Sequence, residues 1–323
     1  MAILGCYAED IDFISPSSVA LTTSFGFRTA YARCIVACPS GGTRTLPFVG
    51  GTITSAWLSF YMFSNPSLTN RRWCGLINSA SGNLSGLWFG LGSPVSKAAI
   101  FKYDGTTLTT LATEAGNSMG GTVKVDLQLA NYGSSSVVNV FINGALVISY
   151  SGSTAISGVS NLDCVGIGGD AAIGGGGMSE IIVADEDTRS LSLLTMAPTG
   201  AGTTDAWTGT VTNMNGTTFS DANPNFTNTA SLDQQANITD PPTGSFAVKA
   251  VKISARAAAS VGSTPTKLQL GYNSGGSVAV GAAKTLTNAY TTYEQLDATN
   301  PVTSAAWAQS DLAALQVDLK SST

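Results

Sequence analysis

Hydrophobic and polar residues alternate along several short stretches of this chain. Between Val123 and Leu129 every second residue is valine or leucine, and Lys124, Asp126 and Gln128 stand between them, which predicts a strand with one buried and one wet face. Residues 137–142 and 145–150 flank Asn143-Gly144, the pair that a two-residue type I′ hairpin turn prefers. Similar patterns predict strands at residues 31–36, 53–63, 74–78, 87–91, 99–103, 108–113, 162–167 and 180–184.

A second part of the chain follows a change of composition. Residues 179–189 end a β-branched run at Asp185, Glu186 and Asp187, and we expect this run to be the last strand of the first domain. Residues 198–204 contain proline and glycine and are expected to be a linker. Further strands are predicted at residues 246–257, 267–272, 277–280, 291–296 and 315–319, a short helix at residues 304–314, and mostly loop before Asp240.

These elements predict an all-β fold with two β-sandwich (jelly-roll) domains, residues 1–197 and residues 205–323. The length of 323 residues suits two domains that each bury a core. Charged residues make up only 11% of the chain and glycine reaches 36 residues, a composition that favours strands and turns over surface helices.

The charge argues against two classes of partner. The net charge is −5, whereas nucleic acids and anionic membrane surfaces attract basic faces. No apolar run approaches the roughly 20 residues of a membrane-spanning helix. The apolar start at residues 1–7 lacks a basic region and is followed by Glu9, Asp10 and Asp12, so we do not expect a signal peptide.

The residue types needed for most catalytic mechanisms are missing. The chain contains no histidine, which excludes Ser/His/Asp triads, Cys/His pairs and histidine-ligated zinc. The two acidic groups, at residues 9–12 and 185–187, lie at a terminus and at a strand end, where solvated carboxylates are expected. We therefore predict a protein that is not an enzyme; a polysaccharide depolymerase is a lower-ranked alternative, because glycoside hydrolysis needs only two carboxylates.

No metal or other cofactor is predicted. Asn161, Asp163 and Asp170 offer oxygen ligands near Gly168-Gly169, but their spacing matches no calcium loop, and ordinary turn chemistry explains them as well. Cys34 and Cys38 would need two further ligands at matching spacing to bind zinc.

Three aromatic residues are candidates for carbohydrate binding: Trp73, Trp88 and Tyr103. They fall near predicted loops or strand ends, where rings could stack on a sugar. The alternative is that they pack in the core or at a sheet edge.

The cysteines leave two possibilities open. An odd number leaves at least one thiol unpaired within the chain, and reduced core cysteines are expected in a protein made in the cytoplasm. Oxidation after release from the cell, including disulfides between subunits, is the alternative. The residues concerned are Cys6, Cys34, Cys38, Cys74 and Cys164.

The first part of the chain resembles concanavalin A-like (laminin G-like) jelly rolls. The hairpin sequence at residues 138–147, the strand at 165–169 and the closing sequence at 179–185 carry this resemblance. The run Ile-Val-Ala-Asp-Glu-Asp-Thr-Arg at residues 182–189, followed by Trp-Thr-Gly at 207–209, is similar to a group of structural proteins of tailed bacteriophages. Shorter matches at residues 249–252, 255–256, 268–271, 306–307 and 315–317 extend this similarity into the second half.

The resemblance implies a non-enzymatic virion protein on the capsid or tail surface, made in the host cytoplasm. Its partners would be other virion proteins, and it would form homo-oligomers, with trimers favoured. The alternative function is a carbohydrate-binding adsorption protein that contacts host surface glycans. Nucleic-acid binding and membrane insertion are not expected.

Overall fold

The computed structural model describes residues 2–7, 21–22, 34–36, 44–48, 51–63, 71–81, 84–93, 97–168, 177–214, 221–262 and 264–323. The chain divides into two compact units, Met1–Leu194 and Thr195–Thr323. Both units consist of antiparallel β-sheets, which confirms the predicted all-β class. No helix in these ranges is long and apolar enough to cross a membrane.

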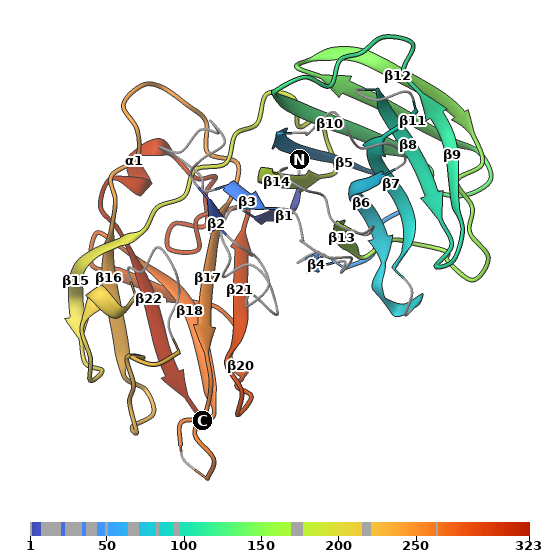
Figure 1. Cartoon of the computed structure of the whole chain (residues 1–323). Coiled ribbons are helices and arrows are strands. Elements are labelled where there is room, and N and C mark those ends of the chain that lie inside the picture. Colours follow the sequence, from blue (N-terminus) through green and yellow to red (C-terminus); the bar gives the residue numbers. More distant parts are fainter. Residues whose placement is uncertain are drawn as a thin grey trace. The chain divides into compact units, whose positions relative to one another are not determined.

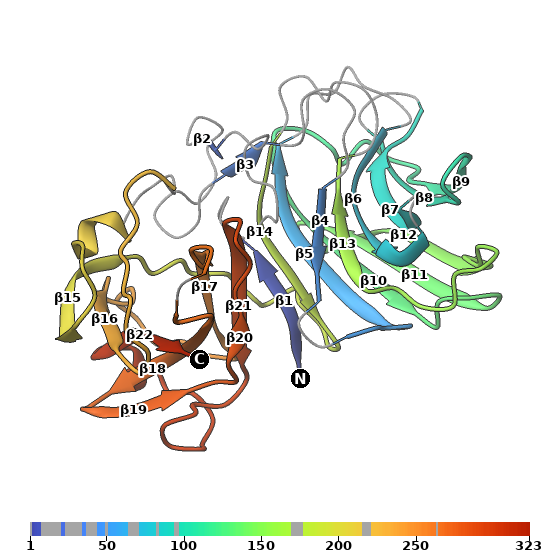
Figure 2. The same cartoon turned by 90° about the horizontal axis from the view of Figure 1, so that it is seen from below.

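The first unit contains two sheets (Figure 1 and Figure 2). In the described ranges the larger sheet has the order β12-β11-β10-β5-β14-β3-β2, with β1 also paired to β14, and the smaller sheet has the order β4-β13-β6-β7-β8-β9. The strands of the larger sheet are β1 (Ile3–Tyr7), β2 (Leu21–Thr22), β3 (Cys34–Val36), β5 (Ala56–Phe63), β10 (Thr122–Ala130), β11 (Ser136–Ile142), β12 (Ala145–Gly152) and β14 (Gly177–Ala184). Those of the smaller sheet are β4 (Arg44–Pro47), β6 (Arg71–Asn78), β7 (Ser85–Leu91), β8 (Ala98–Tyr103), β9 (Leu108–Thr113) and β13 (Cys164–Ile167), and a 3₁₀ turn, η3 (Ser79–Ser81), follows β6.

A hydrophobic core joins the facing sides of these two sheets. Leu58 and Phe60 of β5 and Leu127 of β10 pack with Trp73 and Phe89 of the smaller sheet, and all five are fully buried. The rings of Phe60 and Phe89 meet edge to face with centroids 5.7 Å apart. Burial of large side chains from both sheets is what stabilises a sandwich.

The β11–β12 hairpin has the turn that its sequence predicts. Asn143 and Gly144 both have positive φ, 50° and 83°, as a type I′ turn requires. The Asn143 Oδ1 accepts a hydrogen bond from the Lys124 backbone N–H at 2.9 Å, so the turn is also tied to β10.

The alternation along β10 is confirmed on its core side and wrong at one position on the other side. Val125 and Leu127 are fully buried, as predicted. Asp126, expected to be wet, is also fully buried. The reason is a later segment of the chain that lies over it, which the local pattern of β10 does not encode.

The second unit contains a larger and a smaller sheet. In the described residues the larger sheet has the order β15-β16-β22-β18-β19, with β20 also paired to β18, and the smaller sheet pairs β17 with β21. Tyr272 and Trp307 pack edge to face in its core, with ring centroids 5.2 Å apart. The elements are β15 (Pro198–Asp205), η4 (Val211–Asn213), β16 (Asp233–Ile238), β17 (Val251–Ala257), β18 (Lys267–Ser274), β19 (Ser277–Val280), β20 (Lys284–Thr285), β21 (Thr291–Asp297), α1 (Gln309–Leu312) and β22 (Leu315–Ser322).

The linker predicted at residues 198–204 is wrong, because these residues form β15. This strand pairs with β16, another segment that the sequence predicted as loop. A Cβ at Gly202 would stand 2.7 Å from the Cβ of Gln235, so glycine lets the two strands approach. The Asn237 side chain also donates a 2.7 Å hydrogen bond to the Ala201 carbonyl.

The helix predicted at residues 304–314 is also shorter than expected. Only α1 is helical, because Ser304 has a φ of 59° and residues 298–308 form turns. Trp307, expected on this helix, precedes it and donates a 2.9 Å hydrogen bond to the Asp297 carbonyl.

Candidate functional site

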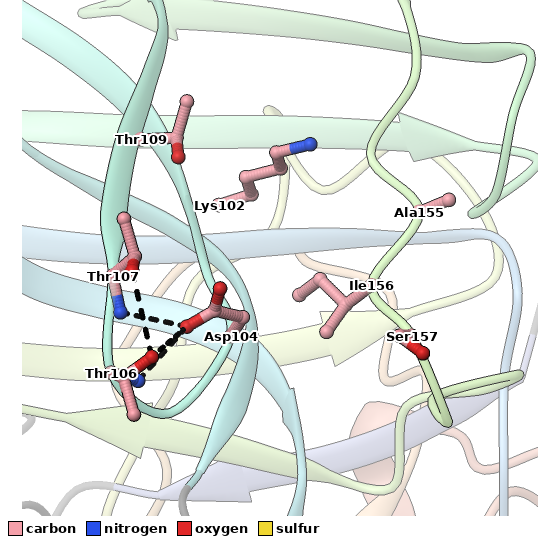
Figure 3. A pocket seen from close by; sticks show the side chains of 8 residues that line it. All are labelled: Lys102, Asp104, Thr106, Thr107, Thr109, Ala155, Ile156 and Ser157. Carbon is pink, nitrogen blue, oxygen red and sulfur yellow. Dashed lines mark hydrogen bonds between the residues drawn. The ribbon is translucent and has the colours of Figure 1, made fainter.

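A polar cleft lies in the first unit, between the turn that joins β8 to β9 and the segment that follows β12 (Figure 3). Its volume is about 430 Å³. The lining side chains carry one ammonium group, one carboxylate, four hydroxyl groups and two apolar groups: Lys102, Asp104, Thr106, Thr107, Thr109, Ala155, Ile156 and Ser157.

Asp104 fixes the first wall of the cleft. Its Oδ1 accepts hydrogen bonds from the backbone N–H groups of Thr106, at 2.9 Å, and Thr107, at 2.7 Å, and from the Thr106 hydroxyl, at 2.9 Å. Gly105, with a φ of 98°, supplies the left-handed residue of this turn. These hydrogen bonds, chiefly that from Thr107, lower the pKa of Asp104, so the carboxylate is ionised at neutral pH.

The second wall is anchored by the residues next to it. Ile156 is buried and forms an isolated bridge with Val159. Thr154 is fully buried; its backbone N–H donates to the Gly133 carbonyl at 2.8 Å, and its hydroxyl lies 2.6 Å from the Ser136 hydroxyl. Both walls therefore rest on hydrogen-bonded turns, so the cleft is formed before any ligand arrives.

The side chains in Figure 3 can form several hydrogen bonds with one ligand. The Lys102 ammonium extends toward the Ala155–Ser157 side, and the second carboxylate oxygen of Asp104 takes no part in the hydrogen bonds drawn. Lys102 donates, Asp104 accepts, and the hydroxyls of Thr106, Thr109 and Ser157 do both. Such a set matches a polyhydroxylated ligand better than an apolar one.

Trp73 and Trp88, two of the aromatic residues selected from the sequence, are fully buried. Trp73 belongs to the core between the sheets, and Trp88 packs with Ile77 and Phe101 on the opposite face of the smaller sheet. Neither indole ring is accessible to a sugar in this conformation, and both tryptophans pack among buried side chains.

Tyr103 is half-buried and also contributes to packing. The Arg72 guanidinium carbon lies 3.6 Å from the centroid of its ring and 5.0 Å from that of Trp88. The Tyr103 hydroxyl donates a 2.8 Å hydrogen bond to the Gly105 carbonyl. Tyr103 thus supports the turn beside the cleft, whereas its neighbours in sequence, Lys102 and Asp104, line the cleft itself.

The cleft residues were missed at the sequence level. Asp104-Gly105 indicated only a turn, and the threonines of β9 indicated only a strand. The available signal was the density of hydroxyl side chains around one acidic turn residue, at 104–110.

The loop considered for calcium has structural roles where it is described. Asp163 accepts hydrogen bonds from the Ser79 backbone N–H, at 2.8 Å, and hydroxyl, at 2.7 Å, and Asn161 accepts one from the Asn78 side chain. Asp170 lies outside the described residues. Within the described ranges, no group of three or more acidic, cysteine or histidine side chains could hold a metal ion.

The cysteines that the structure describes are buried: Cys6, Cys74 and Cys164. Burial raises the pKa of the Cys74 thiol strongly and that of Cys164 to about 12. Cys74 and Cys164 are free thiols, and their burial keeps both sulfur atoms away from the surface in this conformation. The side chains of Cys34 and Cys38 lie outside the described residues.

Asp185, Glu186 and Asp187 are exposed, as the sequence predicted. Asp185 accepts a 2.6 Å hydrogen bond from the Ala2 backbone N–H. Asp187 forms an ion pair with Arg189, with 2.6 Å between the Arg189 Nη2 and the Asp187 Oδ2. This ion pair lowers the pKa of Asp187 and so keeps it charged.

Residues 187–191, which we call the crossing segment, lie across the outer face of the larger sheet. The Arg189 guanidinium carbon lies 4.5 Å from the centroid of Phe141 on β11 and 5.5 Å from that of Trp57 on β5. The Thr188 hydroxyl donates a 3.1 Å hydrogen bond to Asp126 on β10.

The Lys124 side chain holds the crossing segment through hydrogen bonds to its backbone. Its ammonium donates to the carbonyl oxygens of Thr188, Arg189 and Leu191 at 3.2, 2.8 and 3.0 Å. It also lies 3.8 Å from the Asp126 carboxylate. Burial raises the pKa of Asp126, and Lys124 opposes this rise.

Comparisons with known proteins identify no family. No family model matches the chain, and no curated protein matches it. Solved structures that resemble it include the globular domain of T. cruzi calreticulin, with 14% identity and a TM-score of 0.39 over 58% of this chain and 89% of that chain.

Two further matches are a carbohydrate-binding module and an enzyme. The module, CBM66 from Bacillus subtilis, has 10% identity and a TM-score of 0.33 over 55% of this chain and 92% of that chain. The alginate lyase Aly36B, a mutant in complex with alginate trisaccharide, has 11% identity and a TM-score of 0.35 over 58% of this chain and 100% of that chain. At these TM-scores the matches carry no argument about what this chain binds or catalyses.

Proposed function

We propose that this chain is a non-enzymatic, glycan-binding protein on the surface of a bacteriophage particle, where its first unit holds host sugars in the polar cleft. The observation that carries the glycan part is the side-chain set of the cleft: Lys102, Asp104 and several hydroxyl groups on two pre-formed turns.

The size and polarity of the cleft suit one or two sugar rings. Ligand pockets usually have volumes of about 300–1,000 Å³, and this cleft is near the lower end at about 430 Å³. Asp104 accepts hydrogen bonds from sugar hydroxyls, Lys102 donates to them, and Ile156 gives a small apolar contact. Weak binding is sufficient on a particle that displays many copies, because multivalency raises avidity by roughly 10²–10⁴.

The same cleft does not suit glycoside hydrolysis. That reaction uses two carboxyl groups on either side of the scissile bond, and Asp104 is the one acidic residue among those that line the cleft. The turn hydrogen bonds lower its pKa, whereas a general acid needs a raised one.

The phage part of the proposal is supported by sequence. Residues 182–189 and 207–209 are similar to phage structural proteins, and the chain combines few charges with many glycines and tight hairpins. Mass spectrometry of purified particles, with copy-number counting, tests this part. Absence of the chain from the particles would contradict it.

Glycan binding is tested with the full chain clustered on beads and applied to an array of bacterial polysaccharides. Lys102→Met removes a charged donor, and Asp104→Asn removes the charge but keeps an oxygen that can accept the turn hydrogen bonds. A hydrogen bond to a charged group contributes about 1.5–3 kcal/mol, so each variant should bind roughly 10- to 100-fold more weakly.

Lys284→Met is the matched control, because it removes a lysine from β20 in the second unit. We expect it to bind like the parent. The proposal of glycan binding fails if the clustered parent binds no polysaccharide. It also fails if Lys102→Met and Asp104→Asn bind as well as the control Lys284→Met. Release of reducing ends from a bound polysaccharide would instead favour the depolymerase.

A further inference from the structure

We propose that strand β12 pairs with β12 of a second copy of this chain, forming a two-fold dimer through the open edge of the larger sheet. This inference concerns assembly and does not depend on glycan binding.

The first observation is that β12 is an edge strand. It stands at the end of the larger sheet, and within the described residues its strand partner is β11 alone. In an antiparallel sheet the backbone groups of an edge strand alternate, so half of its N–H and C=O groups point away from the sheet. These groups are a template for another strand.

The second observation is that β12 has few of the features that prevent such pairing. Residues 145–152 contain no charged residue and no proline, and edge strands usually carry one or the other. Leu146 is 56% exposed and Val137, on the adjacent β11, is 38% exposed. Leu146 pairs with Phe141, which is on the same face of β11 as Val137, so both exposed apolar side chains lie on the outer face.

One protective feature is present but local. The register shifts between Val140 and Phe141, close to the hairpin turn, and such a bulge twists an edge strand. Beyond it the pairing is regular from Val140 with Ile148 to Ser136 with Gly152. The regular edge therefore covers residues 148–152, where Ser149 and Ser151 are exposed and small enough for a close approach.

The edge of the smaller sheet lies on the same side of the unit. β9 ends that sheet, contacts β12, and also lacks charged residues and proline. Both sheets of the sandwich thus end in uncharged strands next to each other. A partner that covers β12 therefore also meets β9.

A second copy is the partner that this edge fits. The chain carries a net charge of −5, so two copies repel each other wherever their charged surfaces meet, and an uncharged edge avoids this. A two-fold axis brings the same strand to itself in antiparallel orientation, which matches the antiparallel pairing of the rest of the sheet. A charged partner would find no complementary group on β12.

The experiment measures the oligomeric state of the full chain by sedimentation velocity across a concentration series. We expect a monomer–dimer equilibrium. Ser149→Lys places a charge at the regular edge and should raise the dissociation constant of the dimer at least about tenfold. Val261→Lys is the matched control, because Val261 is 83% exposed in the second unit, and it should dimerise like the parent.

A second set of variants tests the two-fold axis. Single cysteines at Val147, Ser149 and Ser151 are oxidised and compared with the parent on non-reducing gels. If the two copies pair antiparallel about one of these three positions, that position lies opposite itself, and its cysteine variant should form a covalent dimer. Circular dichroism confirms folding, and Leu146→Lys replaces Ser149→Lys if the latter does not fold.

Three outcomes overturn the proposal: a parent that is monomeric throughout, a trimer, or a dimer that Ser149→Lys and Leu146→Lys leave unchanged. The cleft variant Lys102→Met should dimerise normally. Loss of glycan binding and loss of dimerisation can therefore be told apart.

Discussion

Replacing Lys124 with methionine tests whether the crossing segment is held by one side chain. Lys124 donates to three carbonyl oxygens of that segment and lies 3.8 Å from the Asp126 carboxylate. The side chains of Lys124 and Asp126 are 13% and 1% exposed, so solvent screens these contacts little. Methionine keeps the length of the side chain and removes the charge and the donors.

The expected loss follows from these contacts. Hydrogen bonds to a charged group contribute about 1.5–3 kcal/mol each, but three bonds that share one ammonium are not additive. Removing one partner of a buried ion pair costs about 3–5 kcal/mol. Because Asp126 can take up a proton and so avoid a buried charge, we expect the lower end, about 3 kcal/mol in the free energy of unfolding.

Urea unfolding of the full chain measures this loss, and hydrogen exchange locates it. Peptides that cover residues 185–193 should exchange faster in Lys124→Met, whereas peptides from the second unit should not change. Adding Asp126→Asn should restore about 1–2 kcal/mol, because it removes the carboxyl left without its cation. Lys102→Met is the control within the same unit; the described residues show no ion pair for Lys102.

The destabilisation should also depend on pH. Without Lys124 the pKa of Asp126 rises further, so at low pH the buried acid is neutral and the missing cation matters less. The loss should therefore grow as the pH rises through the raised pKa of Asp126. A loss below about 1 kcal/mol at all pH values, with unchanged exchange at residues 185–193, would refute the role given to Lys124.

Three further predictions concern other residues. Burial raises the pKa of Asp126 above its ordinary value near 3.8. The protonated Asp126 therefore adds to the free energy of unfolding at low pH, and this contribution is lost as the pH rises through the raised pKa. Asp126→Asn should flatten this dependence in a pH series of urea titrations. Gly166→Ala should lower the free energy of unfolding by about 1–3 kcal/mol, because the new Cβ would lie 2.5 Å from the Trp88 ring, whereas Gly116→Ala, which meets nothing within 4 Å, should cost little. Cys74 and Cys164 should react with a thiol reagent only in denaturant, and rapid labelling of either in native buffer would contradict their burial.

Much of the fold was predictable because the alternation of a strand and the residues of its turns can be read from a few neighbouring positions. The core-facing residues of β10 and the Asn143-Gly144 turn needed only neighbouring residues, and both are confirmed in the structure, whereas the burial of Asp126 depends on the crossing segment. β15 was not predictable in this way, since Gly200 and Gly202 have no side chain and so add nothing to a hydrophobic pattern.

The candidate site was harder to predict than the fold. A tryptophan near a predicted strand end has the same local sequence whether it faces solvent or the core, and Trp88 faces a packed cluster that forms only when β6, β7, β8 and β13 meet. Lys102 and Ser157 lie far apart in the sequence, and only the folded sandwich brings them to one cleft.

The contact between Trp88 and Gly166 limits how this sequence can change over evolution. A Cβ added at position 166 would lie 2.5 Å from the Trp88 ring. Positions 88 and 166 are therefore not independent. In related sequences a side chain at position 166 should accompany a smaller residue at position 88, and a tryptophan at position 88 should accompany glycine at position 166.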